Sequence, residues 1–326
     1  MGGHLTESDR YHIKAQLEVG KTQTEIARKL DIHKSTVSRE LKRNSGRKGY
    51  RPKQAHQKAA KRWNSAAKAI KFTPELAKYV SDCLVKDWSP EQISGRMKLG
   101  GGVTISPERI YQFIGEDKTA GGTLWTHLRW SHRKRKKRYG TRDRRGEIPG
   151  RRSIEKRKRK ANKRKRIGHL ERDLIVGTKH KGALLTAVDR KSRLTFAVKV
   201  NSKSAREIHT ATVKILKPIK SILSTITNDN GKEFASHKKT AKRLGAKIYF
   251  THPYSSYERG TNENTNGLLR QYFPKNNTDF TKVTTRQVAV ALNKLNTRPR
   301  KVLGYRTPIE VTRKELAKMK NVAFVI

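Results

Sequence analysis

Three acidic residues lie inside apolar stretches of a chain that is otherwise strongly basic. Asp173 stands in LERDLIVG, Asp229 in TITNDNGKEF and Glu263 in YERGTNENTNGLLRQYF, with 33 residues between the last two. The chain has 77 Lys and Arg against 27 Asp and Glu, so solubility does not explain carboxylates within apolar segments. Mg²⁺ binds carboxylate oxygens and leaves positions open for water and phosphate. Acids from distant parts of the chain therefore indicate a metal site that cuts phosphodiesters.

Charge and composition limit the partners and the compartment of the chain. A formal net charge of +50 over 326 residues predicts a polyanionic partner, because Lys and Arg that neutralise phosphates release counterions. With 33% hydrophobic residues, two or three domains can build ordinary cores. Cys83 is the only cysteine, which excludes an internal disulfide and a cysteine-based zinc finger. Without a signal peptide or a span of about 18 apolar residues, we expect a cytoplasmic protein with no membrane partner.

The first 50 residues have the pattern of a helix-turn-helix. Thr6 and Thr22 are suited to cap two helices, and His33 or Lys34 begins a third. The expected small core, with Asp31 in the turn, consists of Ile26, Ala27, Leu30, Ile32, Val37 and Leu41. The polar groups on the third helix that suit a DNA major groove are Lys34, Ser35, Thr36, Ser38, Arg39 and Arg43. A three-helix bundle with a solvated charged face is the alternative, which the basic charge of the chain disfavours.

A second helical region covers residues 51–128. Within it, DWSPEQISGRMK and ISPERIYQFI each contain Ser-Pro-Glu, which places an N-cap, a proline and an acid in a first helical turn. Two such starts predict a second helix-turn-helix that binds DNA. Plain helical packing between domains is the alternative.

Residues 129–166 form a basic segment. They include 21 Lys or Arg against three acids, so the segment cannot pack on itself. We expect a linker or arm that becomes ordered along DNA phosphates. A solvated tether is the alternative reading.

After residue 167 the pattern changes to alternating short strands and helices, which predicts a catalytic domain over 167–326. Strands are expected at 170–177, 182–189, 193–200, 222–228 and 246–250, and helices at 204–216, 231–243, 260–272 and 285–297. Three consecutive strands followed by alternating helices and strands fit the ribonuclease-H-like fold, a mixed sheet with helices on both faces. The predicted class is α+β multidomain, with an N-terminal all-α helix-turn-helix region before this mixed α/β domain.

This order of elements places the three acids where they can meet. Asp173 lies on the first strand, Asp229 just after the fourth, and Glu263 on the helix that follows the fifth. Two Mg²⁺ ions about 3.5–4 Å apart would offset the repulsion among such carboxylates, activating the attacking oxygen and stabilising the leaving oxygen. Taken singly, each acid reads as a surface carboxylate or a helix cap. Their joint placement favours catalysis.

Polar residues near the acids have expected supporting roles. Asn266 and Arg270 share a helix face with the third acid, so we expect Arg270 to hold a DNA phosphate and Asn266 to contact a sugar or base. Glu171 shares a strand face with the first acid, and Asp189 ends the second strand. Each of these two acids either assists at the site or pairs with an arginine.

Taken together, the motifs resemble those of the IS30 family of bacterial insertion-sequence transposases. The resemblance rests on STVSRELKRN, GHLERDLIVG, TNDNGKEF, HPYSSYERGTNENTNGLLRQYFPK and LNTRPRKVLGYRTPIEV, which are spread over most of the chain. The long motif around Glu263 is the most specific of them.

The resemblance implies a DDE transposase in which Asp173, Asp229 and Glu263 bind two Mg²⁺ ions, with Mn²⁺ as a substitute. Water would cut the DNA at the end of the element, and the freed 3′-OH would attack a second DNA site. The implied partners are double-stranded terminal inverted repeats and target DNA, with no nucleotide cofactor and no small-molecule substrate. At least a dimer is expected because two DNA ends must be brought together, in a bacterial, nucleoid-associated setting.

Two positions depart from the family pattern beside the first acid. Leu170 and Arg172 stand where a Trp and a Gly are usual. Arg172 is expected either to contact a phosphate or to pair with Glu171 or Asp173 and weaken metal binding.

Two other functions fit parts of the sequence. A DNA-binding regulator with a catalytically silent ribonuclease-H-like domain shares the fold, although the complete acid triad disfavours it. A nuclease acting on RNA or on RNA-DNA hybrids shares the metal chemistry. The helix-turn-helix pattern disfavours the nuclease because it suits the major groove of a DNA duplex.

Overall fold

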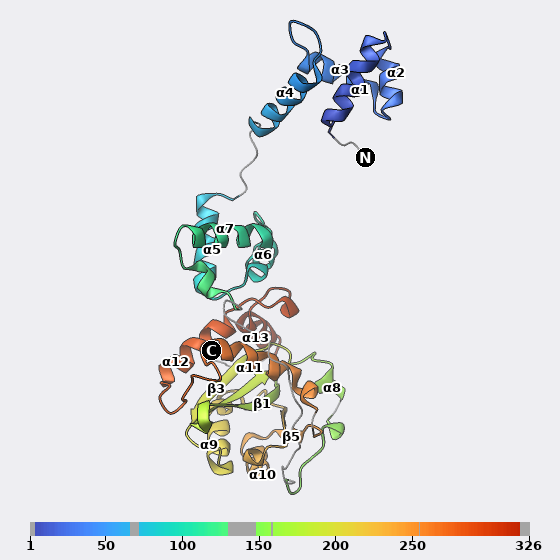
Figure 1. The fold of residues 1–326 in the computed structure, drawn as a ribbon. Coiled ribbons are helices and arrows are strands. Elements are labelled where there is room, and N and C mark those ends of the chain that lie inside the picture. The colour runs from blue at the N-terminus through green and yellow to red at the C-terminus, as the bar shows by residue number, and fades with distance from the viewer. Residues whose placement is uncertain (1–3, 66–71, 130–147, 158, 254, 320–326) are drawn as a thin grey trace. The chain divides into compact units, whose positions relative to one another are not determined.

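The structure is a computed structural model that describes residues 4–65, 72–129, 148–157, 159–253 and 255–319 (Figure 1). The chain divides into two compact units, Met1–Ile70 and Lys71–Ile326. Within the described ranges, no helix has the length and apolar character needed to cross a lipid bilayer.

The first unit contains four helices, α1 (Glu7–Glu18), α2 (Gln23–Lys29), α3 (Lys34–Asn44) and α4 (Pro52–Ser65). The predicted caps are confirmed: Thr6 and Thr22 each form a capping box, and His33 caps α3. Asp31 adopts a left-handed conformation with a φ of 50° in the turn between α2 and α3. The core contains Ile13, Ile26, Ala27, Val37, Tyr50 and Ala55, with Leu30, Ile32 and Leu41 packed against it.

The helix α4 belongs by its packing to this first unit. It contacts α1 and α3, and its Ala55 is fully buried in their core. In the same unit, Arg10 Nε donates to Glu40 Oε1 at 2.8 Å, and the hydroxyl of Tyr50 donates to the same oxygen at 3.1 Å. The unit therefore continues past residue 50, where the sequence pattern places a boundary.

The second unit begins with a helical module of α5 (Pro74–Val85), α6 (Pro90–Leu99) and α7 (Pro107–Thr119). Ser89 and Ser106 cap α6 and α7, each with a proline in the first turn, as predicted from the two Ser-Pro-Glu sequences. Its buried core consists of Val80, Cys83, Leu84, Ile93, Ile105, Ile110 and Ile114. The helices are confirmed, whereas DNA binding by this module stays a prediction.

The catalytic domain is built on a five-stranded mixed sheet in the order β3-β2-β1-β4-β5. The strands are β1 (His169–Val176), β2 (Ala183–Asp189), β3 (Thr195–Val200), β4 (Thr225–Asn228) and β5 (Lys247–Phe250). β2 pairs antiparallel with β1 and β3, whereas β4 runs parallel to β1 and to β5. Each predicted strand is present within a few residues of its expected limits.

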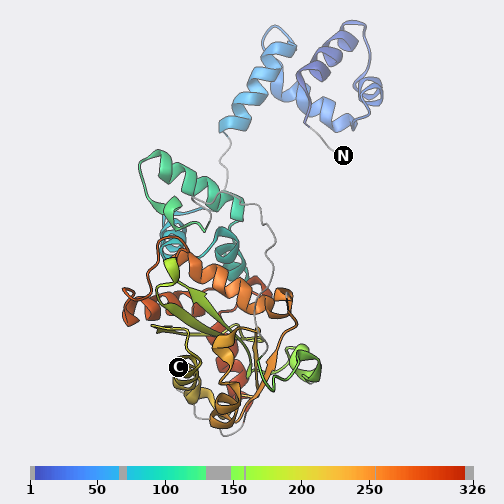
Figure 2. The ribbon, with the colours of Figure 1, turned by 60° about the horizontal axis from the view of Figure 1, so that its bottom comes forward.

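Helices cover both faces of this sheet. They are α8 (Arg159–Asn162), α9 (Ala205–Leu216), α10 (His237–Leu244), α11 (Gly260–Tyr272), α12 (Thr285–Asn296) and α13 (Pro308–Ala317). Figures 1 and 2 show α9 and α10 on one side of the strands and α11 and α12 on the other. The predicted mixed sheet between two helical layers is confirmed.

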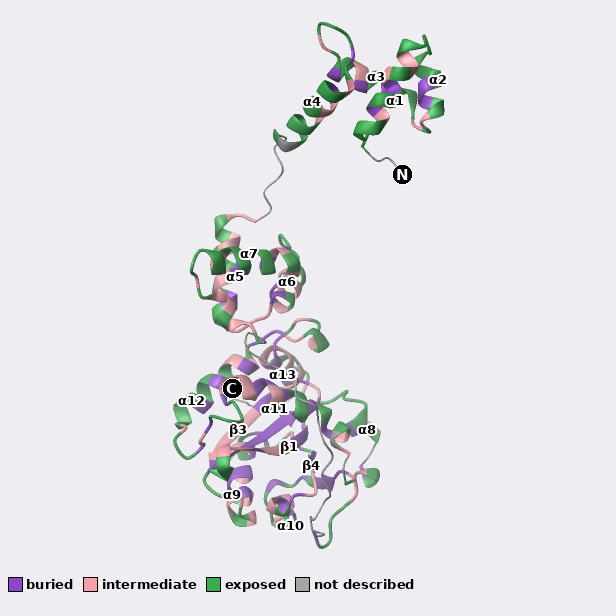
Figure 3. Ribbon diagram, in the orientation of Figure 1, coloured by how far each residue is buried: buried purple, intermediate pink, exposed green. Residues whose placement is uncertain are grey.

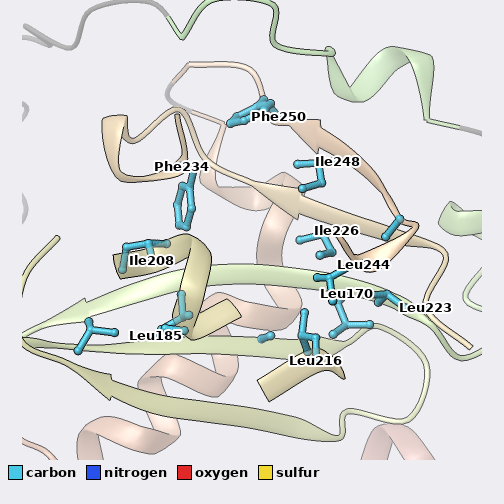
Figure 4. Close-up of a cluster of buried hydrophobic side chains, with 14 of the residues drawn as sticks. Leu170, Leu185, Ile208, Leu216, Leu223, Ile226, Phe234, Leu244, Ile248 and Phe250 are labelled. Atoms are coloured by element: carbon cyan, nitrogen blue, oxygen red, sulfur yellow. The ribbon is translucent and has the colours of Figure 1, made fainter. Parts of the chain in front are cut away.

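Each face of the sheet has its own apolar cluster. The cluster on the side of α9 and α10 includes Leu170, Leu185, Ile208, Leu216, Ile226, Phe234 and Phe250 (Figure 4). The cluster on the side of α11 and α12 includes Ile175, Leu184, Leu268, Leu269, Phe273, Phe280, Val288 and Leu295. Figure 3 shows that the central strands between them are mostly buried, and every residue of β2 is buried. Successive residues of β1 therefore enter different environments.

Asp87, between α5 and α6, joins the helical module to the catalytic domain. Its carboxylate accepts hydrogen bonds from Lys294 Nζ at 2.7 Å and from the Tyr272 hydroxyl at 2.9 Å. His127 Nδ1 lies 3.2 Å from the other oxygen. These contacts link the module to the last residue of α11 and to α12.

A second contact joins α6 to the C-terminal segment. The two terminal nitrogens of Arg96, Nη1 and Nη2, donate to the carboxylate of Glu310 at the start of α13, at 2.8 and 2.5 Å. Gly95 lies so close to the Tyr305 ring that an added Cβ would overlap it. The helical module and the catalytic domain therefore pack directly on each other.

Part of the basic segment packs on the catalytic domain. Ile148 is buried in the cluster beside α9 and α10, and Ser153 forms a β-bridge with Phe250. The buried Arg157 donates to Thr227 Oγ1 at 2.7 Å. The predicted DNA arm also includes residues 130–147, which lie outside the described residues.

Candidate active site

Asp173 and Asp229 lie together on neighbouring parallel strands, Asp173 within β1 and Asp229 at the end of β4. β1 and β4 are paired through Glu171 and Thr227, which places Asp173 just beyond the paired segment and Asp229 directly after β4. The guanidinium of Arg259 bridges the two acids, with Nη1 3.1 Å from Asp173 Oδ2 and Nη2 3.4 Å from Asp229 Oδ2. The predicted meeting of these two acids is therefore present in the structure.

Hydrogen bonds fix the orientation of both carboxylates. The amide of Asn266 on α11 donates to Asp173 Oδ2 at 3.0 Å, and the backbone N–H of Leu174 donates to Oδ1 at 2.9 Å. The backbone N–H of Gly231 donates to Asp229 Oδ1 at 3.0 Å. Both side chains are partly exposed, 24% for Asp173 and 22% for Asp229, so a ligand can reach them.

The environment of Asp173 disfavours its charged form. Burial raises the pKa of the Asp173 carboxyl, the cation of Arg259 opposes this rise, and the charge of Asp229 adds to it. Two carboxylates this close repel each other unless a cation lies between them. The pair is therefore suited to bind a positive charge.

Glu263 does not join the two aspartates in this structure. It lies exposed on the first turns of α11, four residues after Arg259. Across the described parts of the chain, no three His, Cys, Asp or Glu side chains are grouped closely enough to hold a metal ion. The expectation that three acids converge is thus met for two of them, and Arg259 takes the position beside them.

The side chains of Asn266 and Arg270 form contacts with strand β1. The side chain of Asn266 holds Asp173 and accepts a hydrogen bond from Thr186 Oγ1 at 3.0 Å. Arg270 donates to the carbonyl oxygens of Val176 at 2.9 Å and Phe273 at 3.3 Å, and burial lowers its pKa. Their contacts to DNA stay predictions, whereas their contacts within the domain position α11 on the sheet.

The two neighbouring acids have structural partners. Glu171 is fully buried, pairs with Arg190 at 2.9 Å, and accepts a hydrogen bond from the backbone N–H of Asn262 at 2.9 Å. Asp189 accepts backbone hydrogen bonds from Gly168 at 2.7 Å and Ser192 at 2.7 Å. Of the two predicted roles for Glu171, pairing with arginine is the one present, whereas Asp189 stabilises a turn.

Arg172 points to the opposite face of the sheet from Asp173. It is 1% exposed, donates to Asn228 Oδ1 at 3.0 Å and Thr212 Oγ1 at 2.5 Å, and lies 4.5 Å from the Phe234 ring centroid. Neither predicted role is correct, because successive residues of a strand face opposite sides and this side is closed to solvent. Burial lowers the pKa of Arg172 to about 9, so it stays charged at neutral pH.

The donor set fits a divalent cation. Asp173 and Asp229 each present one carboxylate oxygen, Oδ2, to the same guanidinium group, and oxygen ligands of this kind are those that Mg²⁺ prefers. The residues present at this site are therefore compatible with a divalent metal ion.

The predicted DNA-reading residues lie on α3. Lys34, Ser38, Arg39 and Arg43 are exposed, whereas Ser35 and Thr36 are half-buried. The guanidinium of Arg39 donates to Ser35 Oγ at 2.6 Å, which holds the two side chains side by side along the helix. The surface is therefore available to a duplex, and its DNA contacts stay predictions.

Sequence reasoning missed Arg259, which contacts both aspartates. A signal for it was present, because Arg259 stands four residues before Glu263 in the motif YERGTNEN, a spacing of about one helical turn. An arginine one turn from a predicted metal ligand indicates a competing cation.

Known proteins are similar to this chain over most of its length. A helix-turn-helix domain family matches residues 2–44, and an integrase core domain family matches residues 163–256. The transposase for insertion sequence element IS4351 of Bacteroides fragilis is 44% identical, over 99% of this chain and 99% of its own length. Transposase InsI for insertion sequence element IS30A of Escherichia coli strain K12 is 38% identical, over 96% of this chain and 84% of its own. The catalytic core domain of BIV integrase covers 47% of this chain, at 22% identity and a TM-score of 0.36, and the alignment includes 99% of that domain.

Proposed function

Because this chain belongs to the IS30 family of insertion-sequence transposases, we propose that it cuts DNA at the terminal inverted repeats of an element and joins the freed ends to a target. The observation that supports this chemistry is the pair of partly exposed carboxylates, Asp173 within β1 and Asp229 directly after the neighbouring β4. The chain is a DNA transposase with an integrase core, and the residue roles below are our proposal.

Asp173, Asp229 and Glu263 are the proposed metal ligands. When bound, two Mg²⁺ ions, or Mn²⁺ in their place, would polarise the phosphodiester and stabilise charge on the attacking and leaving oxygens. Asn266 keeps Asp173 in position through its hydrogen bond at 3.0 Å. Glu263 lies on the same helix and would complete the set once α11 presents it to the aspartates.

The proposed reaction has two steps on DNA. Water first hydrolyses one phosphodiester bond at the end of the element and leaves a 3′-OH. That 3′-OH then attacks a target phosphodiester, so that one bond forms as another breaks. The balance needs no nucleotide cofactor and no small-molecule substrate, and it leaves no covalent bond between protein and DNA.

The proposed assembly on DNA requires more than one copy of the chain. Two ends of an element must be held near one target, so we propose at least a homodimer. Because chromosomal DNA is the substrate, we expect the protein at the bacterial nucleoid. The helices α3 and α7 are the proposed groove-binding elements of the two helical regions.

A strand-transfer assay tests the function directly. The full chain is incubated with labelled linear DNA that carries the repeats flanking its own gene, with Mg²⁺ or with EDTA. We expect nicks at the repeat ends and joined products only with the metal and the repeats. DNA of equal length with scrambled ends is the control. Binding without cutting under all conditions would favour the silent regulator, and cutting of RNA alone would favour the nuclease.

Arg39 provides a separate test of sequence reading by α3. We expect Arg39→Ala to lower the preference for repeat ends over random DNA about tenfold, because a base-reading arginine contributes about 1–3 kcal/mol of discrimination. Competition binding of the full chain to both DNAs at fixed salt measures the ratio. Arg28→Ala, which removes an exposed arginine from α2, is the matched control. An equal loss of affinity for both DNAs would show that Arg39 contacts only phosphates.

A further inference from the structure

Arg259 occupies an unusual position for a cation in a site of this kind. It is only 9% exposed, lies directly before α11, and reaches both Asp173 and Asp229 with its two terminal nitrogens. Its Nη1 also lies 3.4 Å from the carbonyl oxygen of Arg172, a contact at the long end of hydrogen-bond distance. Among the described residues, its Nε has no hydrogen-bond partner. The contacts of this buried guanidinium are thus concentrated on the two acids.

The contacts of Arg259 differ from those of a purely structural arginine. Arg190, for comparison, pairs with the fully buried Glu171 and donates to the backbone carbonyl of Ala161. Its partners are closed to solvent and cannot receive a ligand. The carboxylates that Arg259 bridges are partly exposed, so the same oxygens are accessible to a competing cation.

We propose that Arg259 is an internal counter-cation of the Asp173–Asp229 pair and must leave before a divalent metal binds there. This inference rests on the proposed metal role of the two aspartates. A guanidinium and a metal ion cannot lie between the same two carboxylates, because both need the same oxygens and carry like charge. A metal ion can bind only to molecules in which Arg259 has left the pair. The apparent metal affinity therefore falls in proportion to the fraction of such molecules.

The local backbone is compatible with this exchange. Arg259 is the last residue of a short 3₁₀ turn, and its own conformation is not helical. Apart from the chain neighbours and the backbone of the helix itself, no heavy atom lies within 4 Å of the position that a Cβ on the next residue, Gly260, would take. Glu263 lies one turn further along the helix. Withdrawal of Arg259 would therefore free the Oδ2 atoms of both aspartates near the start of the helix that carries the third acid.

Manganese binding to the full chain, measured by calorimetric titration without DNA, tests the proposal. We expect Arg259→Gln to bind Mn²⁺ about tenfold more tightly than the natural chain, since the competing cation is gone. In EDTA the same variant should melt at a lower temperature, because the two carboxylates then repel each other without compensation. Arg259→Lys keeps the charge but cannot bridge both acids, and its affinity should lie between the two.

Two further variants separate the possible failures. Arg286→Gln removes an equal charge from an exposed position on α12, and its Mn²⁺ affinity should match that of the natural chain. Asp173→Asn should lose Mn²⁺ binding. If Asp173→Asn binds as tightly as the natural chain, the proposed metal site is wrong. If Asp173→Asn loses Mn²⁺ binding, but both Arg259 variants bind Mn²⁺ no more tightly than the natural chain, the proposed role of Arg259 is wrong.

Discussion

Replacing Asp173 with Asn should reduce cutting and joining of DNA about a thousandfold or more, with DNA binding unchanged. The substitution keeps the shape of the side chain and one acceptor oxygen, but it replaces the other oxygen with an NH₂ donor and removes the negative charge that a divalent cation needs. Asp173 contacts Asn266 and Arg259, and it lies far along the chain from α3, the proposed DNA-reading helix. Rates of strand cleavage at saturating DNA, with binding measured in parallel, check the expectation.

The other two acids should behave alike if they share the site. Asp229→Asn and Glu263→Gln are each expected to abolish cutting, and Asp82→Asn, an exposed acid on α5, is the control. Glu263→Gln is the most informative of these variants because Glu263 stands apart from the aspartates in this structure. Cutting at the natural rate by Glu263→Gln would remove Glu263 from the proposed ligands. Lost DNA binding or a lower melting temperature in Asp173→Asn would show a structural role.

The sheet and its helices were predictable because their signals are local. Short runs rich in apolar and β-branched residues mark β1 to β5, and the helical spans were expected within a few residues of α9, α11 and α12. The order of these elements determines which strands lie at the centre of this fold. The positions of Asp173 and Asp229 followed from that order, since Asp173 lies on the central strand β1 and Asp229 directly after its neighbour β4. The resemblance to the IS30 family is confirmed by the relatives.

The arrangement around Glu263 was not predictable because it depends on how α11 is rotated about its axis. A helix advances 100° per residue, so a small rotation of α11 changes how directly Glu263 faces the sheet, whereas Arg259 precedes the helix. In the structure Asn262, Asn266 and Arg270 contact β1, at intervals of four residues. Glu263 does not belong to this row of residues, and its side chain is exposed. Packing contacts distant in sequence set this rotation, and the motif alone does not contain them.

The face on which Arg172 lies was predictable in principle. Alternation along β1 places Glu171, Asp173 and Ile175 on the side of α11, and Arg172 on the side of α9. A charged side chain on that side was unexpected because its neighbours form an apolar cluster. Polar groups from Asn228 and Thr212 and the ring of Phe234 make the charge tolerable there.

Arg172→Gly should therefore destabilise the catalytic domain without acting on the chemistry. Removing a large, fully buried side chain leaves a cavity and two unpaired polar partners, Asn228 and Thr212, at an expected cost of about 3–5 kcal/mol. The melting temperature of the full chain should fall by about 10 °C or more. Cutting per folded molecule, measured well below that temperature, should stay within about tenfold of the natural rate, since Asp173 lies on the other face.

Arg172→Met distinguishes a packing role from an electrostatic one. Methionine fills much of the same volume and removes the cost of burying a charge, so the loss of stability should be smaller than with glycine. Asp229 is close enough for its charge to favour protonated Arg172, so the two residues do interact through space. If Arg172→Met melts like the natural chain yet cuts at less than about one hundredth of its rate, the charge acts on the acid pair. If Arg172→Met cuts at the natural rate, and only Arg172→Gly has a lower melting temperature, Arg172 is a packing residue.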